Sequence, residues 1–256
     1  AVRTFETYVA SYGQGPQANQ AQYYLAESLA GLARQNLLEG EKAAGDSLGL
    51  LALQELRILA QAPTGPWTQK AQIRLVEMEA AAAPDSLKYA ALEAGYARFL
   101  GANAGLDNPH RANALLGLAN AQRHLGHRQP AKLDTALRTY RTLQSQCAQS
   151  PLRADALFGI GLSRARQGGF VDAIDSLDRF LRSFPGHALA PQALFELGQA
   201  QLLEGRPREA IARYQELLLA HPTFPQRHSA QLQLAQIHYE QGEYSRVIAL
   251  LKPLSE

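Results

Sequence analysis

The fold of this chain is decided by the stretch PQALFELGQAQLLEGRPREAIARYQELLLAHP, which runs from Pro191 to Pro222. Before Gly205, residues on one face recur at three- and four-residue spacing, at Leu194, Leu197 and Gln201. After Gly205 the same spacing recurs at Ala210, Tyr214 and Leu217. Each half therefore predicts an amphipathic helix, the glycine predicts the turn between them, and the closing proline ends the second helix.

The same pattern recurs along the chain at a fixed period. Gly168, Gly205 and Gly242 follow one another at intervals of 37 residues. The pattern positions of the quoted stretch are Leu194, Leu197, Gly198, Ala210, Tyr214, Leu217 and Pro222. Their counterparts in the preceding unit are Leu157, Ile160, Gly161, Ala173, Leu177, Phe180 and Pro185, and those in the following unit are Leu234, Ala235, Val247, Leu251 and Leu254. Such a period indicates one supersecondary unit stacked on copies of itself, because a single unit cannot bury its apolar face alone.

The first half of the chain carries weaker copies of this unit with longer connections. We expect an insertion at His127–Lys132 (HRQPAK), a turn at Ala81–Ser86 (AAAPDS) and a loop at Gly40–Ser47 (GEKAAGDS). Near the start, Ala1, Phe5 and Tyr8 have the spacing of a second helix whose first helix is missing. We therefore expect the sequence to be a segment of a longer protein.

These observations predict an all-α fold, a right-handed α-solenoid of tandem helix-turn-helix repeats with about thirteen helices and no sheet. We expect a single array, with residues 1–15 as the second helix of a truncated repeat and six repeats at 16–64, 65–106, 107–150, 151–187, 188–224 and 225–256. Helices should break near Gly126, Gly168, Gly205 and Gly242. Because the front of the array lacks a polar cap, self-association through uncapped ends is one hypothesis.

Composition and motifs argue against catalysis and against nucleic-acid binding. The formal net charge is +2 and no lysine or arginine run is present, so no nucleic-acid interface is expected. His124 and His127 have no carboxylate cluster to complete a metal site, and Cys147 is interpreted as a small packing residue rather than a reactive thiol. No apolar run approaches the ~18 residues of a membrane span. We therefore expect no catalytic residue, metal, cofactor or direct membrane insertion in this segment.

These repeated positions resemble the tetratricopeptide repeat. In that repeat, the first helix carries a small residue after Leu, and the second helix carries Ala, then an aromatic residue, then Leu, before a closing Pro. Gly161 and Gly198 stand at the small position, where two helices are expected to cross closely. The resemblance implies that the first helices line a concave face that binds a protein or peptide partner.

The resemblance also implies which residues a partner contacts, because the second, fifth, ninth and twelfth positions of each repeat point into that face and their spacing keeps them on one stripe. The stripe mixes apolar anchors with amides, which suits an extended or helical peptide with few charges. The predicted partner-binding residues are Tyr23, Asn120, Phe158, Phe195, Gln199, Leu232 and Gln236. The alternative for the apolar members is that they only pack first helices against one another.

A clamp for the carboxylates of a peptide, which occurs in this family, needs Lys at a fifth position and Asn at the ninth, followed by a basic pair. Lys70 and Arg74 have the positions of the basic pair, but no preceding repeat supplies the Lys and Asn, and Asn120 stands apart from them. An acidic C-terminal peptide ligand is therefore not expected.

The Pro-containing connections in Ser183–Gly205 and His221–Tyr244 resemble the bacterial envelope subgroup that includes the outer-membrane β-barrel assembly lipoprotein and the Tol–Pal cell-division coordinator. This implies a non-catalytic adaptor in a larger envelope-associated assembly, in the bacterial periplasm or at the outer-membrane periphery, with a cytoplasmic location as the alternative. The second hypothesis is a regulatory or targeting region of a larger enzyme or polysaccharide-export system, whose catalytic domain lies outside this segment.

Overall fold

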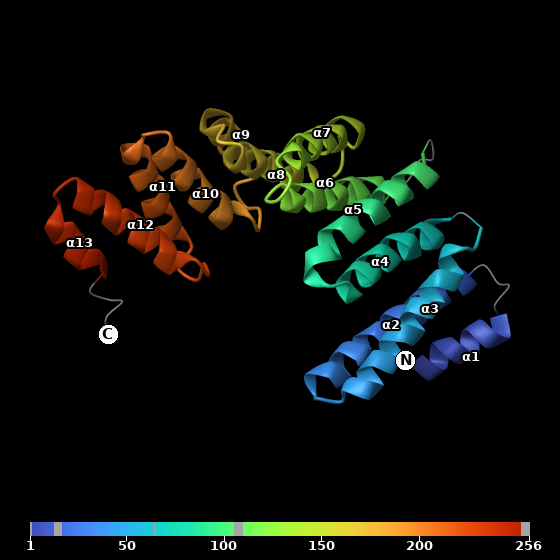
Figure 1. Cartoon of the computed structure of the whole chain (residues 1–256). Coiled ribbons are helices and arrows are strands. Elements are labelled where there is room, and N and C mark those ends of the chain that lie inside the picture. Colours follow the sequence, from blue (N-terminus) through green and yellow to red (C-terminus); the bar gives the residue numbers. More distant parts are fainter. Residues whose placement is uncertain (1, 13–16, 64, 105–109, 252–256) are drawn as a thin grey trace. The chain divides into compact units, whose positions relative to one another are not determined.

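The computed structural model describes residues 2–12, 17–63, 65–104 and 110–251, which form thirteen α-helices and no strand (Figure 1). The helices are α1 (Val2–Tyr12), α2 (Ala18–Leu38), α3 (Lys42–Ala60), α4 (Pro66–Ala82), α5 (Asp85–Ala102), α6 (Arg111–Leu125), α7 (Ala131–Gln146), α8 (Arg153–Arg166), α9 (Phe170–Ser183), α10 (Ala190–Leu203), α11 (Pro207–Ala220), α12 (Arg227–Glu240) and α13 (Tyr244–Leu251). The predicted all-α fold of tandem helix pairs is confirmed.

The chain divides into two compact units, which are described separately. The first extends to Ala121 and the second begins at Gln122, so the division falls within α6. In the second unit α8, α10 and α12 are the first helices of their repeats, and α7, α9, α11 and α13 are second helices. Among the residues that the structure describes, no helix combines the length and the apolar character needed to cross a membrane.

Glycines with positive φ end three of the first helices. The backbone φ is 78° at Gly168, 77° at Gly205 and 75° at Gly242, in the left-handed region that residues with a Cβ rarely adopt. α8, α10 and α12 each end just before one of these glycines, and α6 ends one residue before Gly126. The predicted helix breaks are therefore confirmed.

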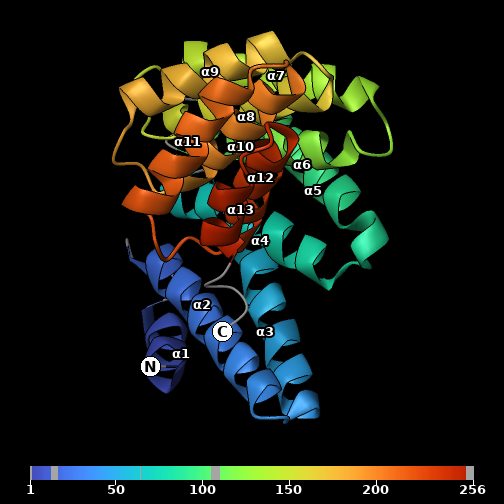
Figure 2. The same ribbon diagram turned by 90° about the vertical axis from the view of Figure 1, so that its left-hand side faces the viewer.

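The connection between α2 and α3 differs from the sequence-based expectation. The stretch from Gly40 to Ser47 was expected to be a loop, but α3 begins at Lys42, and the two long helices run side by side (Figures 1 and 2). Gly40 makes the tight turn with a φ of 86°. Gly45 packs inside the helix pair, since a Cβ there would lie 2.7 Å from Leu37 Cγ. The loop prediction was wrong because this glycine marks a close contact rather than a break.

Close helix crossings occur where the sequence placed them. A Cβ at Gly161 would lie 2.7 Å from Leu177 Cγ, and a Cβ at Gly198 would lie 2.8 Å from Tyr214 Cε1. Both distances are shorter than van der Waals contact, so only glycine allows each first helix to approach its second helix this closely. The predicted packing role of these two glycines is confirmed.

The core of the second unit follows the repeat. Tyr140, Leu177 and Tyr214 occupy equivalent positions of α7, α9 and α11, and each side chain is 0% exposed. Burial of a large apolar side chain stabilises a fold by about 1.5–3 kcal/mol. The recurring buried side chain therefore makes each second helix a stabilising layer between first helices.

Candidate partner-binding surface

Three aromatic members of the predicted stripe lie in the core. Tyr23, Phe158 and Phe195 are each 6% exposed. The ring centroid of Phe158 lies 5.7 Å from that of Phe180, and the centroid of Phe195 lies 6.0 Å from that of Tyr214. These rings therefore pack the helices against one another, as the alternative interpretation of the stripe expected. Their contact with a partner stays a prediction.

The exposed members of the stripe lie on α12. Leu232 is 56% exposed, and Gln236 is exposed and donates a hydrogen bond from Nε2 to Glu240 Oε1 over 3.1 Å. Tyr239, seven residues after Leu232, is 62% exposed, and its ring centroid lies 5.6 Å from that of Tyr244. Residues spaced by four and seven share one helix face. We call Leu232, Gln236, Tyr239 and Tyr244 the α12 surface.

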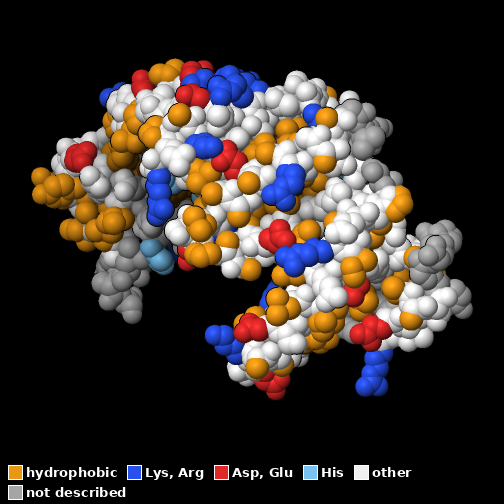
Figure 3. Space-filling model, turned by 45° about the vertical axis from the view of Figure 1, so that its right-hand side comes forward, with side chains coloured by type: hydrophobic (Ala, Val, Ile, Leu, Met, Phe, Trp, Pro, Cys, Tyr) orange, Lys and Arg blue, Asp and Glu red, His pale blue; other side chains and the backbone are white. Residues whose placement is uncertain are grey.

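Tyr239 and Tyr244 are not among the binding residues predicted from the sequence. The signal for Tyr239 was present, since it stands at the twelfth position of its repeat, on the same stripe as Leu232 and Gln236. Tyr244 begins α13, and only the turn at Gly242 brings its ring to Tyr239. Figure 3 shows hydrophobic side chains gathered at this end of the second unit.

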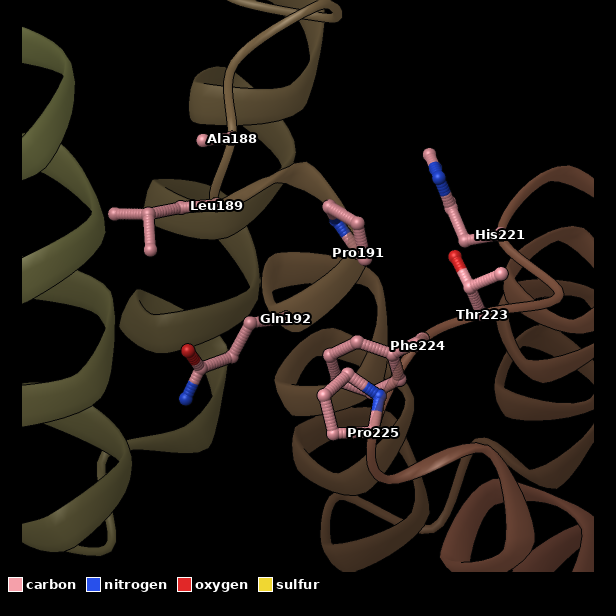
Figure 4. A pocket seen from close by; sticks show the side chains of 8 residues that line it. All are labelled: Ala188, Leu189, Pro191, Gln192, His221, Thr223, Phe224 and Pro225. Carbon is pink, nitrogen blue, oxygen red and sulfur yellow. The ribbon is translucent and has the colours of Figure 1, made fainter.

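α10 adds polar groups and a small pocket to the same unit. Gln199 is half-buried, and Leu203, four residues later, is 66% exposed. At the start of α10, Gln192 lines an open pocket of about 300 Å³ between the connections before α10 and α12. The pocket is lined by Ala188, Leu189, Pro191, Gln192, His221, Thr223, Phe224 and Pro225. In Figure 4, Phe224 and Pro225 lie between Gln192 on one side and His221 and Thr223 on the other.

A polar cluster of the second unit lies on residues from α6, α7, α8 and α10. Arg123 Nε donates to Tyr140 Oη over 3.3 Å, and Arg166 Nη1 donates to the Arg123 carbonyl oxygen over 3.0 Å. Burial raises the pKa of Glu196, against the opposing effects of a hydrogen bond with Gln192 and the charges of the two arginines. This part of the unit therefore presents both signs of charge rather than a purely basic surface.

The predicted residues Tyr23 and Asn120 belong to the first unit, whereas the other five belong to the second. Asn120 is half-buried on α6. The Tyr23 ring packs in a cluster with Leu56 and Leu59, and burial together with the charge of Glu27 raises the pKa of Tyr23 to about 12. Neither residue lies in the same compact unit as the α12 surface.

The basic pair of the first unit is engaged with its own chain. Arg74 Nε lies 2.6 Å from Glu27 Oε1, and Arg74 Nη1 lies 3.2 Å from Glu77 Oε2. Lys70 Nζ lies 4.5 Å from the ring centroid of Tyr23. Two carboxylates compensate the guanidinium, and a cation–π contact holds the ammonium. The absence of a clamp for a peptide carboxylate stays a prediction.

A buried histidine links the last two helices. His238 is 2% exposed, and its Nδ1 lies 2.6 Å from Glu243 Oε2, an oxygen that Arg246 Nη1 approaches to 2.8 Å. The hydrogen bond with His238, followed by the charge of Arg246, lowers the pKa of Glu243. Within the described residues, no group of three His, Cys, Asp or Glu side chains could hold a metal ion. The contact joins α12 to the turn before α13.

Changing Glu243 to Gln is expected to lower the melting temperature near neutral pH. It should also make the melting temperature less sensitive to acidification. Because the pKa of Glu243 is lower in the folded state, its ionised form stabilises the fold above the unfolded pKa of about 4.3, and this stabilisation is lost as the pH falls through the folded-state pKa. As the pH is lowered from about 6 to 3, the melting temperature should fall less steeply for the variant than for the parent. An equal fall of the melting temperature with pH in variant and parent would contradict the stabilising contact of Glu243 with His238 and Arg246. The control is Glu204→Gln, at an exposed glutamate.

Comparison with known proteins supports the repeat assignment. The tetratricopeptide repeat family model matches residues 131–188, 158–210 and 195–252. Comparison with curated proteins gave no significant sequence match.

Several solved structures share the fold at low sequence identity. The apo form of RapI has a TM-score of 0.61 at 12% identity, covering 99% of this chain and 69% of that chain. A tetratricopeptide repeat protein from Parabacteroides merdae has a TM-score of 0.57 at 16% identity, covering 90% of this chain and 78% of that chain. A thermophilic TPR protein from Thermus thermophilus has a TM-score of 0.54 at 19% identity, covering 83% and 98%. The family model therefore supports the tetratricopeptide repeat assignment over residues 131–252, and the solved structures show that the fold is shared.

Proposed function

We propose that this chain is a non-catalytic scaffold that binds a partner protein or peptide through the first helices of its second unit. The observation that carries the proposal is the α12 surface, where Leu232 and Tyr239 are more than half exposed on one face with Gln236. Exposed apolar and aromatic side chains next to hydrogen-bonding amides are typical of interface anchors. Tetratricopeptide repeats supply such surfaces without catalytic groups.

The chemistry of the α12 surface favours a partner segment with few charges. Its side chains are one leucine, two tyrosines and one glutamine, with no acidic or basic residue among them. Tyrosine combines a large apolar ring with a hydroxyl that donates and accepts, and glutamine can do both through its amide. An amphipathic helix or an extended segment with apolar anchors would satisfy these groups.

The first experiment places a photo-crosslinking amino acid at Gln236 and, as control, at Ala212, an exposed residue of α11. Crosslinking in the source cells should give a defined adduct from position 236 and none from position 212. Adducts of equal yield from both positions would contradict the proposed surface. The crosslinked protein is then purified for titration.

Changing Leu232 and Tyr239 together to Ser is expected to weaken binding of that protein by about thirtyfold or more, since loss of a true hot spot costs about 2 kcal/mol or more. The matched control is Leu219→Ser on α11, a leucine that is 86% exposed. Titration calorimetry of both variants, with far-UV circular dichroism to check the fold, measures the difference. Equal affinity of the double variant and the parent would exclude the α12 surface.

For the cellular setting, we propose that the scaffold is part of a bacterial envelope-associated assembly, in the periplasm or at the outer-membrane periphery. The support is the resemblance of the connections in Ser183–Gly205 and His221–Tyr244 to repeats of envelope adaptors. Fractionation of source cells that express the full-length protein tests this setting. Recovery with cytoplasmic markers alone would overturn it.

Self-association is a second hypothesis for the surface of α13. Tyr244 is 59% exposed and Ile248 is 66% exposed, and no described residue of this helix is buried. Sedimentation velocity over a range of concentrations should show a mass that rises with concentration, and Ile248→Asp should abolish that rise. A constant monomer mass would exclude the hypothesis.

A further inference from the structure

A cleft in the first unit lies between α1 and the start of α2 and is independent of the proposed scaffold surface. Its volume is about 410 Å³, and it is lined by Thr4, Tyr8, Gln17, Gln20, Ala21 and Tyr24. A volume of about 300–1,000 Å³ is usual for small-molecule sites. The cleft is therefore large enough for a small ligand.

Helical spacing explains why these side chains meet. Thr4 and Tyr8 are four residues apart on α1, and the four lining residues from Gln17 to Tyr24 follow at spacings of three, four and seven. Such spacings put each set on one face of its helix. Ala21, which is 7% exposed, leaves room at the centre of the α2 face because it has no side chain beyond Cβ. Tyr8 Oη donates to Gln17 Oε1 over 3.4 Å and thereby links the two sides.

The lining is aromatic and polar but uncharged. Two tyrosine rings stand beside one threonine hydroxyl and two glutamine amides, and none of the described lining residues is Asp, Glu, Lys, Arg or His. An ionised ligand would find no compensating charge among these six side chains. A purely apolar ligand would cover the Gln20 amide and the Thr4 hydroxyl without offering either a hydrogen bond. The chemistry that fits both features is a neutral ring with one apolar face and several hydroxyls.

We propose that this cleft binds a neutral sugar ring. Sugar hydroxyls both donate and accept, as do the glutamine amides and the threonine and tyrosine hydroxyls. The C–H face of a sugar ring can pack on the tyrosine rings in the way that other apolar groups pack on aromatic faces. The eight residues from Gln17 to Tyr24 span seven helical steps, or about 10 Å, at the start of α2, which suits one or two rings better than a long extended peptide.

The chain contains a built-in reporter for this site. Trp67 is the only tryptophan, and its ring centroid lies 5.5 Å from that of Tyr24, which lines the cleft and is 40% exposed. A ligand packed on Tyr24 should change the surroundings of the indole. Titration with maltotetraose, cellotetraose and chitotetraose should give a saturable change in Trp67 fluorescence with at least one of them, and saturation-transfer NMR should show the bound sugar directly.

Matched variants separate a sugar site from a surface effect. Gln20→Leu keeps the side-chain size but removes the amide, and Thr4→Val removes the hydroxyl; each should weaken binding of the sugar at least tenfold with unchanged helical content. Gln35→Leu, on the same helix outside the cleft, should bind as the parent does. Glucose 6-phosphate should bind at least tenfold more weakly than the neutral sugars.

Three results would overturn the proposal. The first is the absence of binding by NMR for all three oligosaccharides. The second is an equal loss of binding in Gln20→Leu and Gln35→Leu. The third is tighter binding of a neutral peptide, N-acetyl-Gly-Gln-Gly-amide, than of any sugar, which would assign the cleft to peptide recognition. None of these results bears on the α12 surface, which lies in the other unit.

Discussion

Replacing Gly159 by leucine is expected to lower the free energy of unfolding by about 3 kcal/mol, near the upper end of the usual cost of overpacking. A Cβ at this position would lie 2.3 Å from Tyr140 Cζ. Tyr140 has little room to move, because its side chain is 0% exposed and its hydroxyl is bonded to Arg123. The added side chain would therefore push α8 away from α7. Urea denaturation followed by circular dichroism measures the loss.

The same substitution elsewhere should have the opposite sign. Gly31 of α2 and Gly101 of α5 are exposed helical glycines, and a Cβ at either position would meet no atom within 4 Å. Leucine has a higher helix propensity than glycine by somewhat less than about 1 kcal/mol, so Gly31→Leu and Gly101→Leu should raise the stability slightly. If all three variants lost stability equally, the loss at Gly159 would not come from the contact with Tyr140.

Changing Phe158 and Phe195 together to Ala is expected to unfold much of the second unit, because truncation of a buried phenylalanine costs about 3–5 kcal/mol. The two rings belong to different buried clusters, one with Leu177 and Phe180 and the other with Tyr214 and Leu217, so their effects should largely add. Chemical denaturation of each single variant and of the double variant measures the sum.

The control for this prediction is Leu232→Ala with Tyr239→Ala, since both side chains are more than half exposed. Exposed substitutions usually change stability by less than about 0.5 kcal/mol. The two pairs should thus separate the roles of the stripe, with the phenylalanines acting on stability and the α12 residues on binding. A phenylalanine variant as stable as the parent would show that these rings are dispensable for the core.

Local sequence determined the helices, most of their turns and two of their close crossings. Gly168, Gly205 and Gly242 ended their helices as predicted, because a turn with positive φ needs glycine whatever surrounds it. Gly161 and Gly198 likewise sit at close crossings, because a repeat brings the same pair of helix faces together each time. The prediction of a loop from Gly40 to Ser47 was wrong. Gly45 packs against Leu37, and in sequence such a glycine cannot be told from one that makes a turn.

Only the tertiary structure decided which stripe residues face solvent. Phe195 and Leu232 hold equivalent positions 37 residues apart, yet Phe195 is 6% exposed and Leu232 is 56% exposed. Phe195 packs against Tyr214 of α11 and Phe224 of the following connection, which are distant from it in sequence. Spacing along a helix specifies the face on which a side chain lies, whereas its exposure depends on what the neighbouring helices and connections place over that face.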